Sequence, residues 1–275
     1  MSNDNDRLDL HIHTTFSDGD MTPEEVVKEA ERFGLAGIAI TDHDEVAGVD
    51  VAMEAAGSGF EVVPGVELST SDGKSDIHIL GYLIDTKSGE LRKYLDLFRD
   101  ARRTRGIRMV ERLQKMGVDI EVGAVLERAG GGSVGRPHIA AALVENGAVD
   151  SVEAAFKKYI GFHSPAYVAK YQLKPSDAFR LIRETGGVGG MAHPGTTRRD
   201  DLITGFIAEG MRAIEVYHPK HSEGDIARYR RLGEKLGLVV TGGSDSHGMR
   251  NEKLHIGART VPRSTIELLK KARSY

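Results

Sequence analysis

Histidine, aspartate and glutamate side chains stand at the ends of several apolar runs in this sequence, where they could bind metal ions. Six of the eleven histidines are among them. Residues two apart on a strand point to the same face, as His11 and His13 would, and can reach one ion. The nine candidate ligands are His11, His13, Asp18, His43, Glu67, His78, His193, Asp245 and His247. Mixed sets of imidazole and carboxylate suit Mn²⁺, Fe²⁺ or Zn²⁺.

The position of these residues along the chain argues against coincidence. In a parallel α/β barrel, the carboxyl ends of the strands share one face, and active sites lie on that face. A single histidine there would more often be an ordinary core or surface residue. Nine polar side chains buried at strand ends would each need a separate partner, and a shared metal site supplies one for all of them.

Composition narrows the possible chemistry. The chain has 275 residues, 40% of them hydrophobic and 28% charged, which is typical of a globular protein with one large domain or a domain with an insert. The absence of cysteine excludes disulfides, thiolate zinc sites and cysteine nucleophiles. No apolar run approaches the ~20 residues of a membrane span, and the N-terminus lacks an apolar signal core. We therefore expect a soluble cytoplasmic protein that has no membrane segment, and no obligate protein partner is evident.

The formal net charge of −4 does not suit a basic nucleic-acid coat protein. The charge is unevenly spread, because residues Glu90–Lys115 contain nine Lys or Arg against four Asp or Glu. That excess fits an anionic substrate, although a solvated helix face has the same composition.

Short β-rich runs alternate with amphipathic stretches over most of the chain. Thr22–Gly34 is the clearest helix, with Pro23 and acidic residues in its first turn and a glycine at its end. Such alternation predicts a parallel sheet with crossover helices. A closed or distorted barrel and an open doubly wound sheet both remain possible. The expected strands begin at Arg7, Leu35, Phe60, Asp76, Gly186, Met211, Leu238 and Ile256.

Residues 90–162 interrupt this alternation, because four successive segments there have helical patterns and no strand pattern separates them. We predict two parts of one barrel domain, residues 1–89 and 163–275. Between them we predict an inserted helical subdomain, residues 90–162.

The metal-ligand motifs resemble those of the PHP family, named for polymerase and histidinol phosphatase. The resemblance implies a distorted (β/α)7 barrel (the PHP fold) in the α/β class, a trinuclear metal site and phosphoester hydrolysis. All nine ligand positions of the family are filled in this chain. The matching segments are Asp-Leu-His11-Ile-His13, Ser-Asp18-Gly, Thr-Asp-His43-Asp, Gly-Val-Glu67, His78, Ala-His193-Pro and Ser-Asp245-Ser-His247.

Further segments resemble the stand-alone PHP phosphoesterases: Gly135-Arg136-Pro137-His138, Phe156-Lys-Lys-Tyr159 and Glu215-Val-Tyr217-His218-Pro219. That group removes the 3'-phosphate from nucleoside 3',5'-bisphosphates, and some members trim short RNA from the 5' end. The resemblance implies a metal-dependent phosphatase or phosphodiesterase acting on a small phosphorylated substrate, a nucleotide or short RNA. Its expected cofactors are two or three divalent ions, Mn, Fe or Zn.

Two residues are candidates for catalysis. Phosphate monoesters hydrolyse very slowly, so a bridging hydroxide between metals ~3.5–4 Å apart is the expected nucleophile. Glu67 is the candidate bridging carboxylate. His218 is a candidate to protonate the leaving oxygen or to hold the substrate, and a surface loop histidine is the alternative. Asp9 is either a partner for a ligand imidazole or a buried aspartate with backbone partners.

Two residues of the insert are candidates for substrate binding. Arg136 precedes Pro137 at a predicted helix start, and we interpret it as a bidentate phosphate clamp rather than a surface arginine. His138 would lie in the first turn, where backbone N–H groups favour an anion. The insert would then form a substrate-binding lid. Tyrosines 159, 167 and 217 could stack on a base, although packing is their more usual role.

Two alternatives remain open. An L-histidinol-phosphate phosphatase would share the metal chemistry but need no nucleotide pocket. A non-enzymatic metal-holding module is the other alternative, and the intact set of nine ligands argues against it.

Overall fold

The computed structural model describes residues 6–129, 134–169, 173–248 and 255–273. The chain forms two compact units. The first, the barrel unit, comprises Met1–Lys93 and Gln172–Tyr275, and the second, the helical unit, comprises Tyr94–Tyr171. None of the described helices is long and apolar enough to cross a lipid bilayer.

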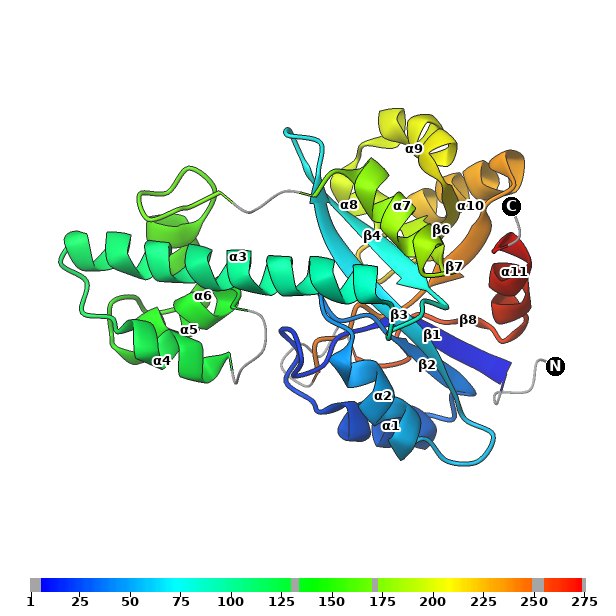
Figure 1. The fold of residues 1–275 in the computed structure, drawn as a ribbon, viewed down its shortest axis with the longest axis horizontal. Helices are drawn as coiled ribbons and strands as arrows, with labels where there is room; N and C mark the ends of the chain where they lie inside the picture. Colours follow the sequence, from blue (N-terminus) through cyan, green and yellow to red (C-terminus); the bar gives the residue numbers. More distant parts are fainter. Residues whose placement is uncertain (1–5, 130–133, 170–172, 249–254, 274–275) are drawn as a thin grey trace. The chain divides into compact units, whose positions relative to one another are not determined.

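The barrel unit is built on one sheet with the strand order β7-β6-β5-β4-β3-β2-β1-β8 (Figure 1). An isolated parallel bridge joins Ile12, at the end of β1, to Ser246, after β7, so the sheet nearly closes on itself. The distorted α/β barrel predicted from the sequence is therefore confirmed. The strands are β1 (Arg7–Ile12), β2 (Gly37–Ile40), β3 (Glu61–Ser71), β4 (Asp76–Tyr82), β5 (Val188–Met191), β6 (Met211–Tyr217), β7 (Val239–Gly242) and β8 (Val261–Pro262).

The sheet is mixed, which differs from the wholly parallel sheet expected from strand–helix alternation. Strands β1 to β3 are parallel, and so are β5 to β7, but β4 runs antiparallel to both β3 and β5. Asp72 and Gly73 form the tight turn between β3 and β4, with Asp72 Oδ1 accepting two backbone N–H groups and Gly73 at φ +85°. Because β4 is reversed, its first residues lie beside the last residues of β3, and His78 pairs with Ser69.

Helices cover the outside of the sheet, as the crossover pattern predicts. Helix α1 begins with a capping box between Thr22 and Glu25, with Pro23 in the first turn, and buries Val26, Val27 and Ala30. Helix α7 packs on β4 and β5, and α10 packs on β6 and β7. The helices of this unit are α1 (Pro23–Arg32), α2 (Ala47–Ala55), α7 (Pro175–Glu184), α8 (Pro194–Thr197), η3 (Asp200–Leu202), α9 (Ile203–Glu209), α10 (Glu223–Leu236) and α11 (Ser264–Ala272).

Strand β1 is buried on both of its faces. Leu8, Leu10 and Ile12 have no exposed surface. Asp9 and His11, which point to the other face of the strand, have none either. Full burial of each such apolar side chain contributes ~1.5–3 kcal/mol. Burial of the polar side chains of Asp9 and His11 must be offset by specific partners. The inside of the barrel is therefore where a functional site is expected.

The helical unit has a core of its own. Met109, Leu113, Ile139 and Leu143 belong to one buried apolar cluster formed by successive helices. The helices are α3 (Gly89–Lys115), which begins in the barrel unit, followed by α4 (Val122–Arg128), α5 (Arg136–Glu145), α6 (Val152–Ala155) and the π-helix η2 (Phe156–Ile160). The described part of this unit contains no strand.

Candidate metal centre

The barrel unit brings candidate ligands from six strands or the loops after them to one place. Three groups have ligand atoms within 4.8 Å of one another and could each hold an ion. Neighbouring groups share a residue, because His13, His43 and Glu67 each belong to two of them. The groups are His13, Asp18, His43 and His247; His11, His13, Glu67 and Asp245; and His43, Glu67 and His78.

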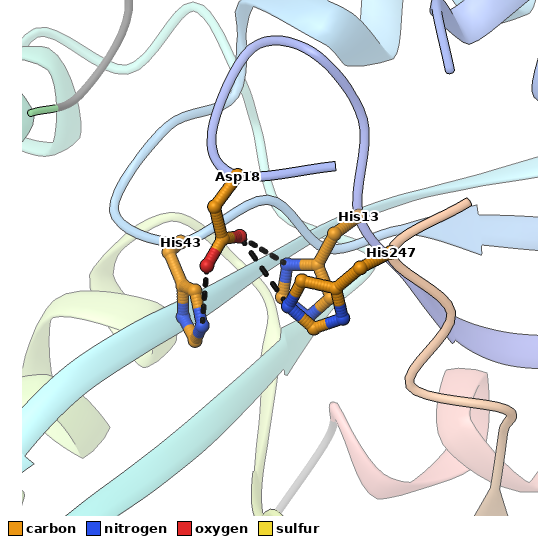
Figure 2. A group of neighbouring side chains, drawn as sticks. All are labelled: His13, Asp18, His43 and His247. Carbon is orange, nitrogen blue, oxygen red and sulfur yellow. Dashed lines mark ion pairs between the residues drawn. The ribbon is translucent and has the colours of Figure 1, made fainter. Parts of the chain in front are cut away.

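The first group surrounds Asp18, which the loop after β1 directs toward three imidazoles (Figure 2). One carboxylate oxygen lies 3.8 Å from His13 Nδ1 and 3.4 Å from His247 Nε2, and the other lies 3.9 Å from His43 Nε2. Ligands of one ion each lie ~2 Å from it, so ligand atoms ~3–4 Å apart fit a common ion.

The second group lies at the end of β1. The Nε2 atoms of His11 and His13 are 3.2 Å apart. Both also face Glu67 Oε2, at 3.3 and 3.2 Å, and Asp245 Oδ1, at 3.6 and 3.3 Å. The close approach of β7 to β1 requires Gly243, because a Cβ there would collide with the backbone of His11.

Glu67 is the centre of the third group and connects it to the second. Its Oε1 lies 2.8 Å from His78 Nδ1 and 3.1 Å from His193 Nε2. Its Oε2 lies 3.0 Å from His43 Nδ1. His78 reaches Glu67 from the start of β4, because that strand is reversed.

Three polar atoms in these groups are buried and form no hydrogen bond of acceptable geometry with a described residue: His13 Nδ1, His43 Nδ1 and Glu67 Oε2, the last two of which face each other at 3.0 Å. Buried polar atoms are nearly always paired, so three orphans among converging ligands need an explanation. A divalent cation accepts lone pairs from imidazole and carboxylate alike. The donor set therefore fits metal ions.

Burial and charge act against each other at the carboxylates. Burial alone would raise the pKa of Glu67, but the imidazoles of His43 and His78 hold it well below its usual value. Burial likewise opposes ionisation of Asp18, yet His43 and His247 hold its pKa well below the usual range. The carboxylates are thus ionised and available to a cation.

Several backbone positions in the site are strained. His193 has φ +27°, Asp245 has φ +51° and Asp44 has φ +52°. Left-handed conformations of residues other than glycine are costly, by ~1–3 kcal/mol each, and persist where the surroundings impose them. Each of the three follows a strand of the barrel, and each is a candidate ligand or adjoins one.

A buried glutamate on β6, to which the sequence analysis gave no role, supports two of the candidate ligands. Glu215 Oε1 lies 2.9 Å from Nδ1 of His11, and Oε2 accepts the backbone N–H of His193 at 2.7 Å. The signal in the sequence was a charged residue inside the apolar strand MRAIEVY, which requires a buried partner.

His218, after β6, is fully buried and contacts a candidate ligand. Its Nδ1 accepts the backbone N–H of Lys220 at 3.1 Å, and its Nε2 lies 3.2 Å from Asp245 Oδ2. Since Nδ1 accepts, the proton of the neutral ring is on Nε2, facing Asp245. Burial lowers the pKa of His218. The Lys220 ammonium also lies 3.0 Å from Asp245 Oδ2.

Asp9 has backbone partners. Its Oδ1 accepts the N–H groups of Ser244 and His11, and its Oδ2 accepts the N–H of Gly257. Burial raises the pKa of Asp9 to about 6. Of the two interpretations made from the sequence, the buried aspartate with backbone partners is the one observed. The carboxylate ties β1 to the chain after β7 and orients no imidazole.

Arg136 and His138 lie in the helical unit, at the start of α5. The Arg136 guanidinium carbon is 5.3 Å from the Phe156 ring centroid and 5.9 Å from that of Tyr167. Nδ1 of His138 accepts the backbone N–H of Gly135 at 3.0 Å, so this imidazole caps the helix. This capping role was not predicted from the sequence.

Comparison with known proteins agrees with this geometry. The PHP domain family model matches residues 9–178. A 3',5'-nucleoside bisphosphate phosphatase from Chromobacterium violaceum is 34% identical over 254 residues, 87% of each chain. The 5'-3' exoribonuclease Rnm of Salmonella typhimurium is 34% identical over 249 residues, 87% of this chain and 84% of its own.

Two further proteins are similar. A phosphoribosyl 1,2-cyclic phosphate 1,2-diphosphodiesterase from Eggerthella lenta is 31% identical over 259 residues, 91% of this chain and 98% of its own. The crystal structure of a predicted metal-dependent phosphoesterase from Bifidobacterium adolescentis superposes with a TM-score of 0.88, at 32% identity, and covers 96% of each chain.

Fold, site and relatives together define the class of protein, a metal-dependent hydrolase that acts on phosphoesters. The chain belongs to the PHP domain family.

Proposed function

We propose that this chain removes the 3'-phosphate from nucleoside 3',5'-bisphosphates and degrades short oligoribonucleotides from the 5' end. Two relatives of similar length are named for these activities and match most of the chain. Both reactions hydrolyse an ester at a 3'-oxygen, so one site can perform both. Such substrates fit a cytoplasmic enzyme.

The observation that carries the proposal is the position of Glu67. Its two oxygens lie within 3.3 Å of five imidazoles, those of His11, His13, His43, His78 and His193. We propose that Glu67 bridges two ions, and that the nine candidate ligands together hold two or three ions of Mn, Fe or Zn. When bound, such ions neutralise phosphoryl oxygens and make water a stronger acid.

The remaining residues of the site hold these ligands in place. Glu215, as an ionised acceptor, keeps the proton of His11 on Nδ1 and leaves Nε2 with a lone pair. We propose that His218 acts in the same way on Asp245, since its Nε2 faces that carboxylate. Protonation of the leaving oxygen by His218 remains a competing prediction.

The candidate metal ligands alone would not distinguish one phosphoester from another, so specificity requires a further residue that contacts the rest of the substrate. We propose that the helical unit is a substrate-binding lid and that Arg136 grips a phosphate that is not cleaved. No carboxylate of a described residue pairs with Arg136, so its guanidinium fork is available to an anion. His138, which caps the same helix start, would bind beside it.

A panel of substrates tests the proposal on Mn-loaded protein, with phosphate release and product length as readouts. We expect kcat/KM to be highest for a nucleoside 3',5'-bisphosphate or a short oligoribonucleotide. L-histidinol phosphate should be a poor substrate, and a preference for it would replace the proposal with that alternative. No metal-dependent turnover of any phosphoester would mean that the chain is not an enzyme of this kind.

Phosphoribosyl 1,2-cyclic phosphate is a second candidate substrate. The Eggerthella lenta relative named for it matches 91% of this chain, a larger share than either nucleotide-directed relative reported above. Its inclusion in the panel separates the two, because a higher kcat/KM on the cyclic phosphate than on the bisphosphate would favour this second function.

A further inference from the structure

One segment of the helical unit has an unusual composition. Residues 154–169 contain no Asp or Glu. The same segment holds Lys157 and Lys158 together with Phe156, Tyr159, Phe162 and Tyr167. Aromatic rings interleaved with cations suit a ligand with flat bases and a polyanionic backbone.

Phe162 is the most exposed large hydrophobic side chain in the described part of the chain, with 69% of its surface accessible. Its ring centroid is 4.2 Å from that of His163 and 5.3 Å from that of Tyr167, with an interplanar angle of 69° in each case. Both contacts are edge-to-face, so neither neighbour stacks in parallel on Phe162. A large exposed ring with neighbours of this kind indicates a binding surface.

Guanidinium groups lie over the neighbouring rings. The Arg105 guanidinium carbon is 5.7 Å from the centroid of Tyr167, and that of Arg136 reaches both Tyr167 and Phe156. We refer to Arg105, Arg136, Phe156, Phe162 and Tyr167 as the aromatic–arginine cluster. Arg105 is buried and supports Tyr167 from below, whereas Arg136 is partly exposed, so rings and a positive charge are combined at the surface, as in proteins that bind single strands.

The backbone under the cluster is fixed. The Arg105 Nε donates to the carbonyl of Val168 at 2.7 Å, and the Arg112 guanidinium donates to the carbonyl of Tyr167. The N–H of Ala166 bonds the carbonyl of Tyr159 at 2.9 Å. His163 holds a left-handed conformation, φ +66°, just after the π-helix η2. A π-helix and a left-handed residue in succession are rare, and each is often found at functional sites. A preorganised surface loses less entropy on binding.

We propose that the aromatic–arginine cluster binds single-stranded RNA, with Phe162 stacking on a base and Arg136, Lys157 and Lys158 contacting phosphates. The choice of a nucleotide strand as ligand rests on the proposed function. The inference goes further by assigning the helical unit a site for a strand longer than one nucleotide. Stacking accepts any base, so we expect little sequence preference.

The test is the affinity of the full-length, Mn-loaded protein for a short 3'-fluorescein-labelled oligoribonucleotide with phosphorothioate linkages, measured by fluorescence anisotropy. Phe162→Ala should weaken the Kd by roughly five- to a hundredfold, the value of one base stack. Phe162→Trp keeps a ring and should retain the affinity. A Kd for Phe162→Ala equal to that of the parent would overturn the proposal.

Phe33→Ala is the matched control, because Phe33 is also exposed (38%) and has Arg32 over its ring but lies in the barrel unit. It should leave the Kd unchanged, and an equal loss there would show that Phe162 is not special. A double-stranded competitor should compete poorly, since its bases are already stacked; competition equal to the single strand would also overturn the proposal. Hydrolysis of a nucleoside 3',5'-bisphosphate by the parent is measured separately, so failure of the proposed function is seen apart from failure of strand binding.

Discussion

Oε1 of Glu215 lies 2.9 Å from Nδ1 of His11, and both side chains are fully buried inside the barrel. The second oxygen of the same carboxylate accepts the backbone N–H of His193. One side chain on β6 therefore orients candidate ligands that lie at the ends of β1 and β5. Such supporting carboxylates fix the imidazole tautomer and make the ligand more basic.

Replacing Glu215 by Gln should weaken metal binding about 10- to 100-fold, because both partners of the carboxylate are donors and the amide NH2 would face one of them. Metal affinity measured by competition with a fluorescent chelator checks this without relying on activity. Glu209→Gln, at the end of α9 just before β6, is the control and should bind metal as the parent does. Unchanged affinity in Glu215→Gln would show that this carboxylate only stabilises the fold.

Chelation tests how many ions the ligand groups hold. We expect at least two divalent ions per chain by elemental analysis, because nine ligands exceed what one ion can accept. Removal of the metal with EDTA should lower Tm, since ions that bind only the folded state stabilise it by ~2.7 kcal/mol at a hundredfold excess over Kd. Reloading with Mn²⁺ should restore Tm. One ion or fewer per chain after reloading would contradict the prediction that the three groups of candidate ligands hold at least two ions.

Glu67→Gln should leave the fold intact and abolish most activity. The change is nearly isosteric, but it removes the one negative charge that faces five imidazoles. Removing one group that stabilises charge in the transition state typically lowers the rate ~10²–10³-fold, so we expect kcat/KM to fall by at least about a hundredfold. Circular dichroism and turnover of a bisphosphate are the measurements. Glu61→Gln on the same strand is the control, and activity within a few-fold of the parent in Glu67→Gln would exclude a bridging role.

The role of His218 can be determined by comparing two substrates whose leaving groups differ in basicity. If His218 orients Asp245, His218→Gln should reduce kcat/KM by a similar factor for a nucleoside 3',5'-bisphosphate and for an aryl phosphate. If His218 protonates the leaving oxygen, the loss should be far larger for the bisphosphate, because a sugar hydroxyl leaves poorly without a proton. We expect equal losses of about tenfold. A strongly unequal pair would establish proton donation instead.

Local signals in the sequence predicted much of the fold. Thr22, Pro23 and Glu25 specify the start of α1 by capping chemistry that needs no distant partner. The direction of β4 was missed because an apolar run has the same pattern in either direction. The Asp72-Gly73 pair between the two runs is a hairpin signal and indicates an antiparallel β4.

Proximity across the barrel was harder to predict. His11 and Glu215 are 204 residues apart, and only the closure of the sheet brings them into contact. The candidate ligands could be named from the sequence because each is a histidine or a carboxylate within or close to a β-rich apolar run. Glu215 and Lys220 lie beside them; the charge of Glu215 inside the apolar strand β6 indicated a buried partner, but no local pattern indicated that this partner would be His11.

Substitution of Arg136 tests the proposal that the helical unit binds substrate. A nucleoside 3',5'-bisphosphate has a second phosphate that an arginine can hold, and a simple aryl phosphate has none. Binding energy from a remote group of the substrate can raise turnover as well as affinity. Arg136→Ala should therefore lower kcat/KM for the bisphosphate by roughly ten- to a hundredfold, the value of a lost charge-assisted contact of ~1.5–3 kcal/mol. Hydrolysis of the aryl phosphate should change little.

The control for this variant is Arg128→Ala, in the same unit, because Arg128 is already paired with Glu145 and should not hold substrate. Arg136→Lys adds a further distinction, since lysine keeps the charge but cannot reproduce a bidentate contact. A fork-like clamp predicts that Lys restores only part of the lost kcat/KM. Equal losses on the two substrates in Arg136→Ala would mean that the arginine acts at the reacting phosphate or in folding, and the clamp would have to be abandoned.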